Sequence, residues 1–395
     1  MIVENSLDEL KKREGAYRII KNFIESDVES ELYDLTGLSG GFIASEEEID
    51  LLQTYIGPAV FEDKLQEVGV NHMGGEKIFA LNRTSSGILA SILALVSKGD
   101  SVVHFLKAHP AHPSIIRACN LVGAVYDEYI DLDQFKIKDN TKLVIITGST
   151  MDHQVLDEES FKKVIERAHN KNIPVFVDDA SGARLRTAIF NQKPACDLGA
   201  DLSVTSTDKL MKGPRGGLMA GKEEYVNMVK AKSNEFGLEA QAPVILAMIN
   251  ALKDYNPQNL RDSISKKDEL FMLLIKSFNM FEKTPTGLMV SKESLKKEVN
   301  SKRDKCNLSE TDLCFLWSMI LLKNENIITI PAVSMPGAST TIRFDLSSND
   351  ANKLEIKEIY EKISRSFEYL LEVCVDEDKS RKIIYNLWGL ISLFC

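Results

Sequence analysis

The chain has 395 residues, of which 44% are hydrophobic and 27% are charged, and its formal net charge is −10. This balance is typical of a soluble globular protein with room for one large domain and a smaller one. The negative charge argues against broad coating of nucleic acid or of an anionic membrane, although it is compatible with a local basic patch.

The cysteines and the apolar runs indicate a cytoplasmic protein. The six cysteines form no C-x-x-C pair and have no histidines at zinc-ligand spacing, so we expect reduced, mostly buried thiols and no metal site. The N-terminal sequence is too charged for a signal peptide. The most apolar run, at residues 314–322, has about half the length that a bilayer requires, so we expect no transmembrane segment.

In chain order, helical patterns cover residues 6–25 and 45–55, with the Gly/Ser-rich sequence LTGLSGGF at 35–42 between them. From Glu76 onward, short apolar strands alternate with helical segments. Asp157 is expected to cap one of these helices. The apolar stripe of this helix consists of Phe161, Val164, Ile165 and Ala168. Two further helices are predicted at 85–97 and 112–123. The predicted strands are KIFALN (77–82), DSVVHFL (100–106), AVYDEYI (124–130), KLVIITG (142–148), IPVFVDD (173–179), DLSVTS (201–206) and GGLMAG (216–221).

This alternation predicts an α/β fold with a doubly wound, mostly parallel sheet and helices on both faces. After about residue 260 the pattern changes to a smaller α/β domain. Its predicted helices cover 267–280, 311–323, 351–373 and 380–394, and its short strands lie near 326–331 and 340–345. We therefore expect an N-terminal helical arm with an active-site loop at 1–75, a large domain at 76–260 and a small C-terminal domain at 261–395.

Polar residues that follow the strands are the candidate site, because ligands bind at the carboxyl ends of strands in such sheets. The sequence Thr84-Ser85-Ser86-Gly87 opens a helix after the first strand, where free N–H groups and the helix dipole favour a phosphate. A plain helix cap is the alternative. His109 and His112 follow the second strand, where an imidazole could stack on an aromatic ring or move protons. Ser149 and Thr150, which follow KLVIITG, are candidate hydrogen-bond donors.

Two acidic residues and a lysine complete this set. Asp178 and Asp179 end a predicted strand, and a buried carboxylate there needs a cation or a protonated nitrogen. Helix capping or a salt bridge with Arg184 or Arg186 is the simpler interpretation. Lys209 follows DLSVTS, and a desolvated lysine can act as a nucleophilic amine. A phosphate cradle, a histidine, a carboxylate and a lysine at successive strand ends are the groups that hold pyridoxal 5'-phosphate. The lysine forms an imine, and the carboxylate keeps the pyridine nitrogen protonated.

The segment TSTDKLMKGPRGG (205–217) is similar to the lysine segment of bacterial selenocysteine synthase, an enzyme of the fold type I pyridoxal-phosphate family. The chain as a whole resembles the archaeal selenocysteine-synthase-like proteins over roughly residues 30–350, most clearly at 83–87, 176–182 and 203–217. The resemblance implies a large cofactor-binding domain, a small C-terminal domain, and a homodimer or a larger homo-oligomer. It also implies elimination or replacement at the β-carbon of an amino acid or aminoacyl substrate. Other chemistries on the same cofactor, transamination or decarboxylation, remain open, as does an RNA-associated protein that retains the fold.

The resemblance also implies roles for single residues. Lys209 would be the Schiff-base lysine, and Asp178 would face the pyridine nitrogen, with Asp179 as the second choice. His112, rather than His109, would stack on the ring. Arg343 would bind the substrate α-carboxylate, with an ordinary strand-end arginine as the alternative. The phosphate contacts would come from Thr84, Ser85, Ser86, Gly87 and Ser206.

Three features depart from the selenocysteine-synthase pattern. Lys212 replaces a glycine, so that a second amine would lie one helical turn from Lys209, and Arg215 replaces a neutral residue. The N-terminal part is shorter than the tRNA-binding extension of the bacterial enzyme, which puts a charged-tRNA partner in doubt and favours a small amino-acid-type substrate. The basic stretch at 292–305 is expected to be solvated helix surface rather than an RNA contact.

Overall fold

The computed structural model describes residues 1–26, 31–38, 40–303 and 306–387, and the chain divides into two compact units. The large unit is Leu38–Leu260, and the small unit combines Met1–Gly37 with Arg261–Cys395. The N-terminal segment up to residue 75 is therefore shared between the two units. Its last part, with α2 (Glu46–Ile49) and α3 (Ile56–Met73), belongs to the large unit.

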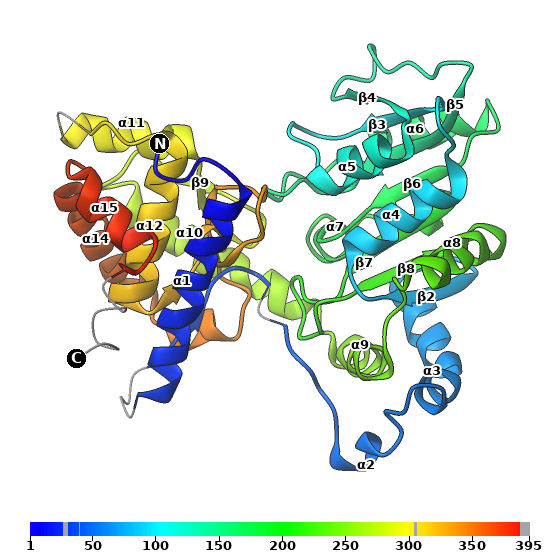
Figure 1. The fold of residues 1–395 in the computed structure, drawn as a ribbon, viewed down its shortest axis with the longest axis horizontal. Coiled ribbons are helices and arrows are strands. Elements are labelled where there is room, and N and C mark those ends of the chain that lie inside the picture. The colour runs from blue at the N-terminus through cyan, green and yellow to red at the C-terminus, as the bar shows by residue number, and fades with distance from the viewer. Residues whose placement is uncertain (27–30, 39, 304–305, 388–395) are drawn as a thin grey trace. The chain divides into compact units, whose positions relative to one another are not determined.

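The large unit contains a seven-stranded sheet in the order β2-β8-β7-β6-β5-β3-β4 (Figure 1). Only β8 runs antiparallel to its neighbours, so the carboxyl ends of the other six strands meet at one edge. The predicted mostly parallel sheet is thus confirmed, with every predicted strand present. The strands are β2 (Lys77–Leu81), β3 (Ser101–Phe105), β4 (Val125–Tyr129), β5 (Thr141–Thr147), β6 (Val175–Asp178), β7 (Leu202–Ser206) and β8 (Gly217–Gly221).

Helices cover both faces of this sheet. One face packs against α4 (Thr84–Leu95), α5 (Pro113–Val122) and α8 (Glu223–Phe236). The other face packs against α6 (Glu158–His169), α3 and α9 (Ala242–Asp254). The cap and stripe predicted for α6 are confirmed, because Asp157 accepts a hydrogen bond from the Ser160 N–H at 2.8 Å and the apolar stripe is buried.

The prediction of a helix over 45–55 was wrong in extent, because α2 is a single turn and α3 begins only at Ile56. Glycine lowers helix propensity, so the glycines of α3 weaken its helical signal in the sequence. Two of these glycines nevertheless allow close packing against neighbouring elements. A Cβ on Gly57 would lie 2.4 Å from the Ala242 Cβ, and one on Gly69 would lie 2.7 Å from Ile78. The neighbouring side chains lie so close to the α3 backbone at these two positions that a residue with a Cβ would clash.

The small unit is built around the buried helix α12 (Glu310–Glu325), whose Trp317 donates a hydrogen bond to Ser366 at 3.0 Å. It has a three-stranded antiparallel sheet in the order β12-β10-β9 and a parallel pair of β1 with β11. The predicted small α/β domain is present, although two of its helices differ in extent. The helix predicted at 267–280 runs from 258 to 274, and α14 starts five residues later than expected. The end of the predicted helix 380–394 lies outside the described residues. The other helices are α1 (Ser6–Glu25), α10 (Gln258–Leu274), α11 (Lys292–Lys302), α13 (Ile330–Val333), α14 (Ile356–Val373) and α15 (Glu377–Ile384). The strands are β1 (Tyr33–Asp34), β9 (Glu282–Lys283), β10 (Gly287–Val290), β11 (Ile327–Ile328) and β12 (Ile342–Asp345).

The cysteines that the structure describes, all except Cys395, are free thiols. Within the same residues, no helix combines the length and the apolar character needed to cross a bilayer.

Candidate active site

The segments that follow the parallel strands of the large unit bring most of the predicted site residues to one edge of the sheet. α4 begins after β2, α5 begins after the loop that follows β3, Asp178 ends β6, and residues 207–213, the lysine loop, follow β7. Lys209 lies near enough to Asp178 and to His112 that its charge acts to lower the pKa of both groups. This convergence agrees with the general position of ligand sites in open α/β sheets.

Asp178 is a buried carboxyl group that lacks a partner on one of its oxygens. Its residue is 5% exposed, and Oδ1 has no hydrogen-bond partner in the described structure. Burial raises the pKa of Asp178 to about 6, and the nearby Lys209 ammonium opposes this rise. A buried, unsatisfied acceptor is costly, so the position is suited to a donor that the protein itself does not supply.

The adjacent Asp179, in contrast, is fully engaged. Its two oxygens accept hydrogen bonds from Nε and Nη2 of Arg186, and both side chains are almost completely buried. Gly148 and Gly182 make room for this pair, because a Cβ on either would lie within about 2 Å of the Asp179 Oδ1. The salt bridge considered for the two acidic residues therefore belongs to Asp179, and Asp178 is the one whose oxygen is still available.

Lys209 lies in a loop whose first residue, Thr207, is hydrogen-bonded to the chain that follows the loop. The Thr207 N–H donates to the Gly216 carbonyl at 3.1 Å, and the Thr207 hydroxyl donates to the Pro214 carbonyl at 2.7 Å. Leu210 has a φ of 59°, which is uncommon for a residue with a side chain. The loop is not helical, so the expected helical spacing of Lys212 from Lys209 was wrong. Lys212 forms an ion pair with Asp254 at 3.5 Å, and both of these side chains are about half exposed.

His112 and His109 have different environments. His112 caps α5, and its Nδ1 accepts the Ser114 N–H at 3.3 Å. Burial first, and then nearby cations that include Lys209, lower the pKa of His112 to about 4, so its imidazole is neutral at physiological pH. His109 instead forms a half-exposed contact with Glu128 at 2.7 Å. Of the two histidines, His112 is therefore the one that the Lys209 charge is shown to affect.

The start of α4 has the features of an anion site. The Ser86 and Gly87 N–H groups donate to the Arg83 carbonyl, whereas the Thr84 hydroxyl oxygen is buried and has no partner in the described structure. A Cβ on Gly217 would lie 2.6 Å from the Arg83 carbonyl oxygen and 2.9 Å from the Thr84 nitrogen, so only glycine lets β8 approach this helix terminus. Helix N-termini with free N–H groups favour phosphate.

Two predicted phosphate contacts are engaged within the protein. The Ser86 hydroxyl donates to the Asn82 side chain, and the Ser206 hydroxyl donates to the Asp208 carboxylate. Asp208 also forms an ion pair with Arg215, whose Nε lies 3.0 Å from Oδ2. Arg215 was expected only to depart from the selenocysteine-synthase pattern, and its pair with Asp208 was not predicted. A buried Asp before the lysine and an Arg six residues after it were the available signal.

Other predicted residues have separate surroundings. Arg343 lies on β12 of the small unit, is 4% exposed, and donates through Nη2 to the Thr36 carbonyl at 3.2 Å. Its role toward a carboxylate stays a prediction. Ser149 and Thr150 are buried in the loop after β5. Among the described residues, no three or more His, Cys, Asp or Glu side chains are grouped as metal ligands.

The residues at this edge fit pyridoxal phosphate. The unpartnered Asp178 oxygen matches a protonated pyridine nitrogen, the Lys209 amine matches the aldehyde, and the Thr84 hydroxyl at the helix start matches the phosphate.

Comparisons with known proteins agree with this fit. Residues 277–355 match the family model described as UPF0425 C-terminal domain, and residues 130–303 match that of L-seryl-tRNA selenium transferase. A UPF0425 pyridoxal phosphate-dependent protein of Methanosphaera stadtmanae is 51% identical over 381 residues, covering 96% of this chain and 99% of the relative. One from Methanothermobacter thermautotrophicus is 49% identical over 385 residues, covering 97% and 100%.

Solved structures show the same architecture. The probable N-succinyldiaminopimelate aminotransferase of Thermus thermophilus superposes with a TM-score of 0.57 and 15% identity, covering 91% of this chain and 99% of that one. At this identity the likeness shows the fold alone. The predicted fold, cofactor and selenocysteine-synthase-like resemblance are thus confirmed. Given its identity with these relatives over nearly its whole length, the chain belongs to the UPF0425 family of pyridoxal phosphate-dependent proteins.

Proposed function

We propose that Lys209 binds the cofactor covalently, that Asp178 holds the pyridine nitrogen in its protonated form, and that the enzyme acts on a small amino-acid-type substrate by β-elimination or β-replacement. The observation that carries this proposal is the buried Asp178 oxygen without a partner beside the Lys209 amine. When bound, the cofactor withdraws electrons from the substrate Cα. Asp179 cannot replace Asp178, because Arg186 already occupies both of its oxygens.

Each remaining residue has a defined task in this proposal. Thr84 and the first turn of α4, with Ser85, Ser86 and Gly87, bind the phosphate, and the Ser86 hydroxyl turns from Asn82 to do so. The Ser206 hydroxyl likewise has to leave the Asp208 carboxylate before it can donate to the phosphate. His112 packs its neutral ring on the cofactor. The Lys209 amine would also move the proton at the substrate Cα. Arg343 supplies the carboxylate contact.

The decisive experiment is borohydride reduction of the purified protein followed by peptide mapping. We expect the visible absorbance to disappear on reduction and the modified lysine to be Lys209. Lys209→Ala should abolish the reducible species, whereas Lys212→Ala should retain it, because Lys212 lies at the surface in an ion pair with Asp254. A reduced adduct on any other lysine contradicts the proposal.

Transamination is the second candidate, because the fold is shared with aminotransferases. Incubation with an amino acid separates the two chemistries. Conversion of the bound cofactor to its amine form, reversed by a keto acid, would indicate transamination. Release of ammonia or of a β-leaving group without that conversion supports elimination. Binding to tRNA is not favoured, since Lys296 of the basic helix α11 donates to the carbonyls of Cys306 and Leu308 and Lys302 pairs with Glu298 at 3.0 Å.

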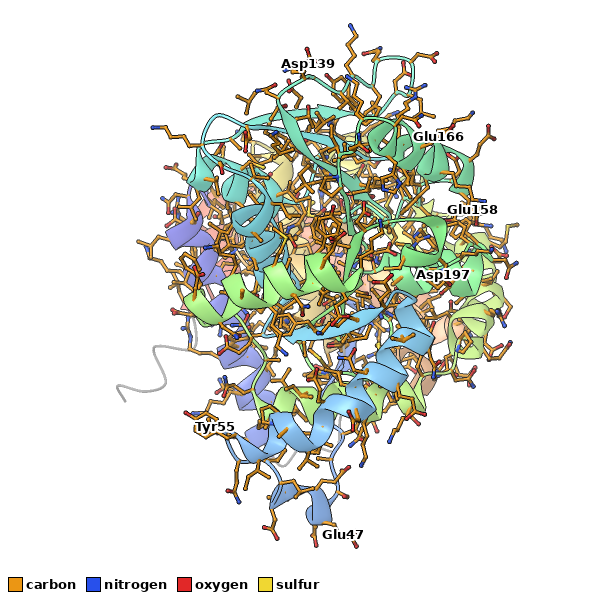
Figure 2. All side chains as sticks on the ribbon, turned by 90° about the vertical axis from the view of Figure 1, so that its right-hand side faces the viewer. Glu47, Tyr55, Asp139, Glu158, Glu166 and Asp197 are labelled. Carbon is orange, nitrogen blue, oxygen red and sulfur yellow. The ribbon has the colours of Figure 1, made fainter. Side chains whose placement is uncertain are left out.

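The large unit also carries exposed apolar residues suited to a homodimer interface. Tyr55 is 87% exposed and lies at the periphery of this unit, as does Glu47 of α2 (Figure 2). The exposed large apolar residues of this segment are Phe42, Ile49, Tyr55, Ile56 and Val60. We propose that they take part in the association of two copies, since exposed apolar surface often marks association sites. Sedimentation of the wild type should give the mass of a dimer or a larger assembly, and Tyr55→Glu with Val60→Glu should shift it toward the monomer.

A further inference from the structure

Arg184 is a completely buried cation for which the described part of the chain provides no carboxylate at ion-pair distance. It ends the short helix α7 (Gly182–Arg184), and its exposed fraction is 0%. Its neighbour in sequence, Arg186, has a carboxylate partner in Asp179. The carboxylates of Asp179 and Asp208 act on its charge only from beyond ion-pair distance. Burying an arginine without an ion pair is costly, so the fold must gain something from the geometry of this side chain.

The guanidinium connects two segments that lead to the site. Nη2 donates to the Ala180 carbonyl at 3.0 Å, just after β6, and to the Thr205 hydroxyl at 2.8 Å and the Ser206 carbonyl, both at the end of β7. Nε donates to the Lys209 carbonyl at 2.7 Å. One rigid planar group thus joins the chain two residues after Asp178 to the backbone of Lys209 itself.

A neutral histidine completes the set of acceptors. The Arg184 Nη1 lies 3.2 Å from Nε2 of His72, on α3. Burial lowers the pKa of His72 to about 3, so the ring is uncharged and Nε2 accepts. The ring packs edge-on against Tyr255 with 5.1 Å between the ring centroids, which fixes its orientation. Arg184 is therefore also held by a side chain of α3.

We propose that Arg184 is a positioning residue that sets the spacing between the backbone of Lys209 and that of Asp178. The inference rests on the proposed function, in which these two residues act at the aldehyde and the ring nitrogen of one rigid ring. The distance between their backbones must then stay fixed. The Ser206 N–H donates to the Ala180 carbonyl at 3.1 Å and so joins the two segments three residues before Lys209. The lysine loop then leaves the regular sheet, and the bond from Arg184 Nε to the Lys209 carbonyl extends the constraint into the loop. A lysine at 184 carries the same charge but cannot reach the Lys209, Ala180 and Ser206 carbonyls together.

The test compares Arg184→Lys with Val164→Ala, a core truncation on α6, on the opposite face of the sheet from Asp178. Thr205→Val removes one acceptor of Arg184 and preserves shape. We measure thermal unfolding, the dissociation constant of added pyridoxal phosphate, and the pH midpoint of the visible absorbance band. Arg184→Lys should weaken cofactor binding about tenfold or more and move the midpoint. Thr205→Val should do so to a smaller degree, and Val164→Ala should lower only the melting temperature.

Two results overturn the inference. In the first, Arg184→Lys and Val164→Ala lose the same amount of melting temperature, bind the cofactor equally well and both keep the wild-type pH midpoint. If Arg184→Lys does not fold, Thr205→Val decides instead. A wild-type cofactor affinity and pH midpoint in Thr205→Val would then refute the positioning role. Borohydride mapping of the wild type separates these failures from a failure of the proposed function, which would place the adduct on a lysine other than Lys209.

Discussion

Replacing Asp178 by asparagine should change the stability of the cofactor-free protein in a pH-dependent way. Burial raises the pKa of Asp178 from 3.8 to about 6 in the folded state. The folded protein therefore binds more protons than the unfolded chain between these values, and its stability falls as pH rises through that window. The loss of unfolding free energy caused by the buried charge is therefore complete above about pH 6 and absent below about pH 4.

The magnitude follows from the shift. About two pKa units at about 1.4 kcal/mol each give a penalty of about 3 kcal/mol for the ionised group. Asparagine has no charge, so it removes this penalty, but its buried amide adds a constant cost of about 1–3 kcal/mol if unpaired. The free energy of unfolding of Asp178→Asn relative to wild type should therefore rise by about 3 kcal/mol from low to high pH. Cofactor retention should be lost in the same variant, because the oxygen for the ring nitrogen is no longer anionic.

Urea denaturation of the cofactor-free proteins at several pH values between about pH 4 and pH 8 measures this difference. Asp179→Asn is the matched contrast, since it breaks the buried pair with Arg186 and should destabilise the protein by about 3–5 kcal/mol near neutral pH. Parallel stability profiles of Asp178→Asn and the wild type across the whole range would refute the reasoning. So would a loss of stability in Asp178→Asn that equals that of Asp179→Asn.

Three further variants test other features. Thr84→Val should weaken cofactor binding about tenfold and change the free energy of unfolding by about 0.5 kcal/mol or less, since the hydroxyl has no partner within the described protein; a cofactor titration and a urea melt check this. Gly217→Ala should destabilise the large unit by about 1–3 kcal/mol, because its Cβ would lie 2.6 Å from the Arg83 carbonyl oxygen, and an unchanged melting temperature would contradict it. Lys12 is buried on α1, and burial lowers its pKa from 10.5 to about 7. The stability of the wild type should therefore rise with pH across that window relative to Lys12→Met, and parallel profiles in denaturant melts would exclude this.

Much of the large unit could be predicted because its strands are short, apolar and regularly spaced. The same regularity placed the polar residues after Phe105, Asp178 and Ser206 at one edge before any coordinates were known. Helix α3 was missed for a different reason. α3 contains glycines that its neighbours require, and its weak amphipathic pattern carries little helical signal. Tertiary contacts rather than local propensity make this helix.

The pairing of charges at the site could not be predicted in the same way. The sequence places two aspartates beside two arginines, and spacing alone leaves several pairings open. Only the structure shows that Arg186 binds Asp179 and that Arg184 binds carbonyl groups instead. The direction of each side chain depends on the irregular turns that follow β6, which no periodic pattern encodes.

This division of charges gives the site its chemical character. If Arg184 paired with Asp178, the carboxylate would be neutralised within the protein and the ring nitrogen would meet a weaker acceptor. The hydrogen bonds of Arg184 to the Ala180, Ser206 and Lys209 carbonyls prevent that pairing, because they use its donors on backbone groups. Asp178 Oδ1 therefore lacks a hydrogen-bond partner within the described protein, and the nearby Lys209 charge offsets only part of the cost of burying the carboxylate. A protonated ligand that donates to this oxygen removes the remaining cost, which adds to its affinity. The same hydrogen bonds of Arg184 therefore position the lysine loop and leave the Asp178 carboxylate available to the pyridine nitrogen.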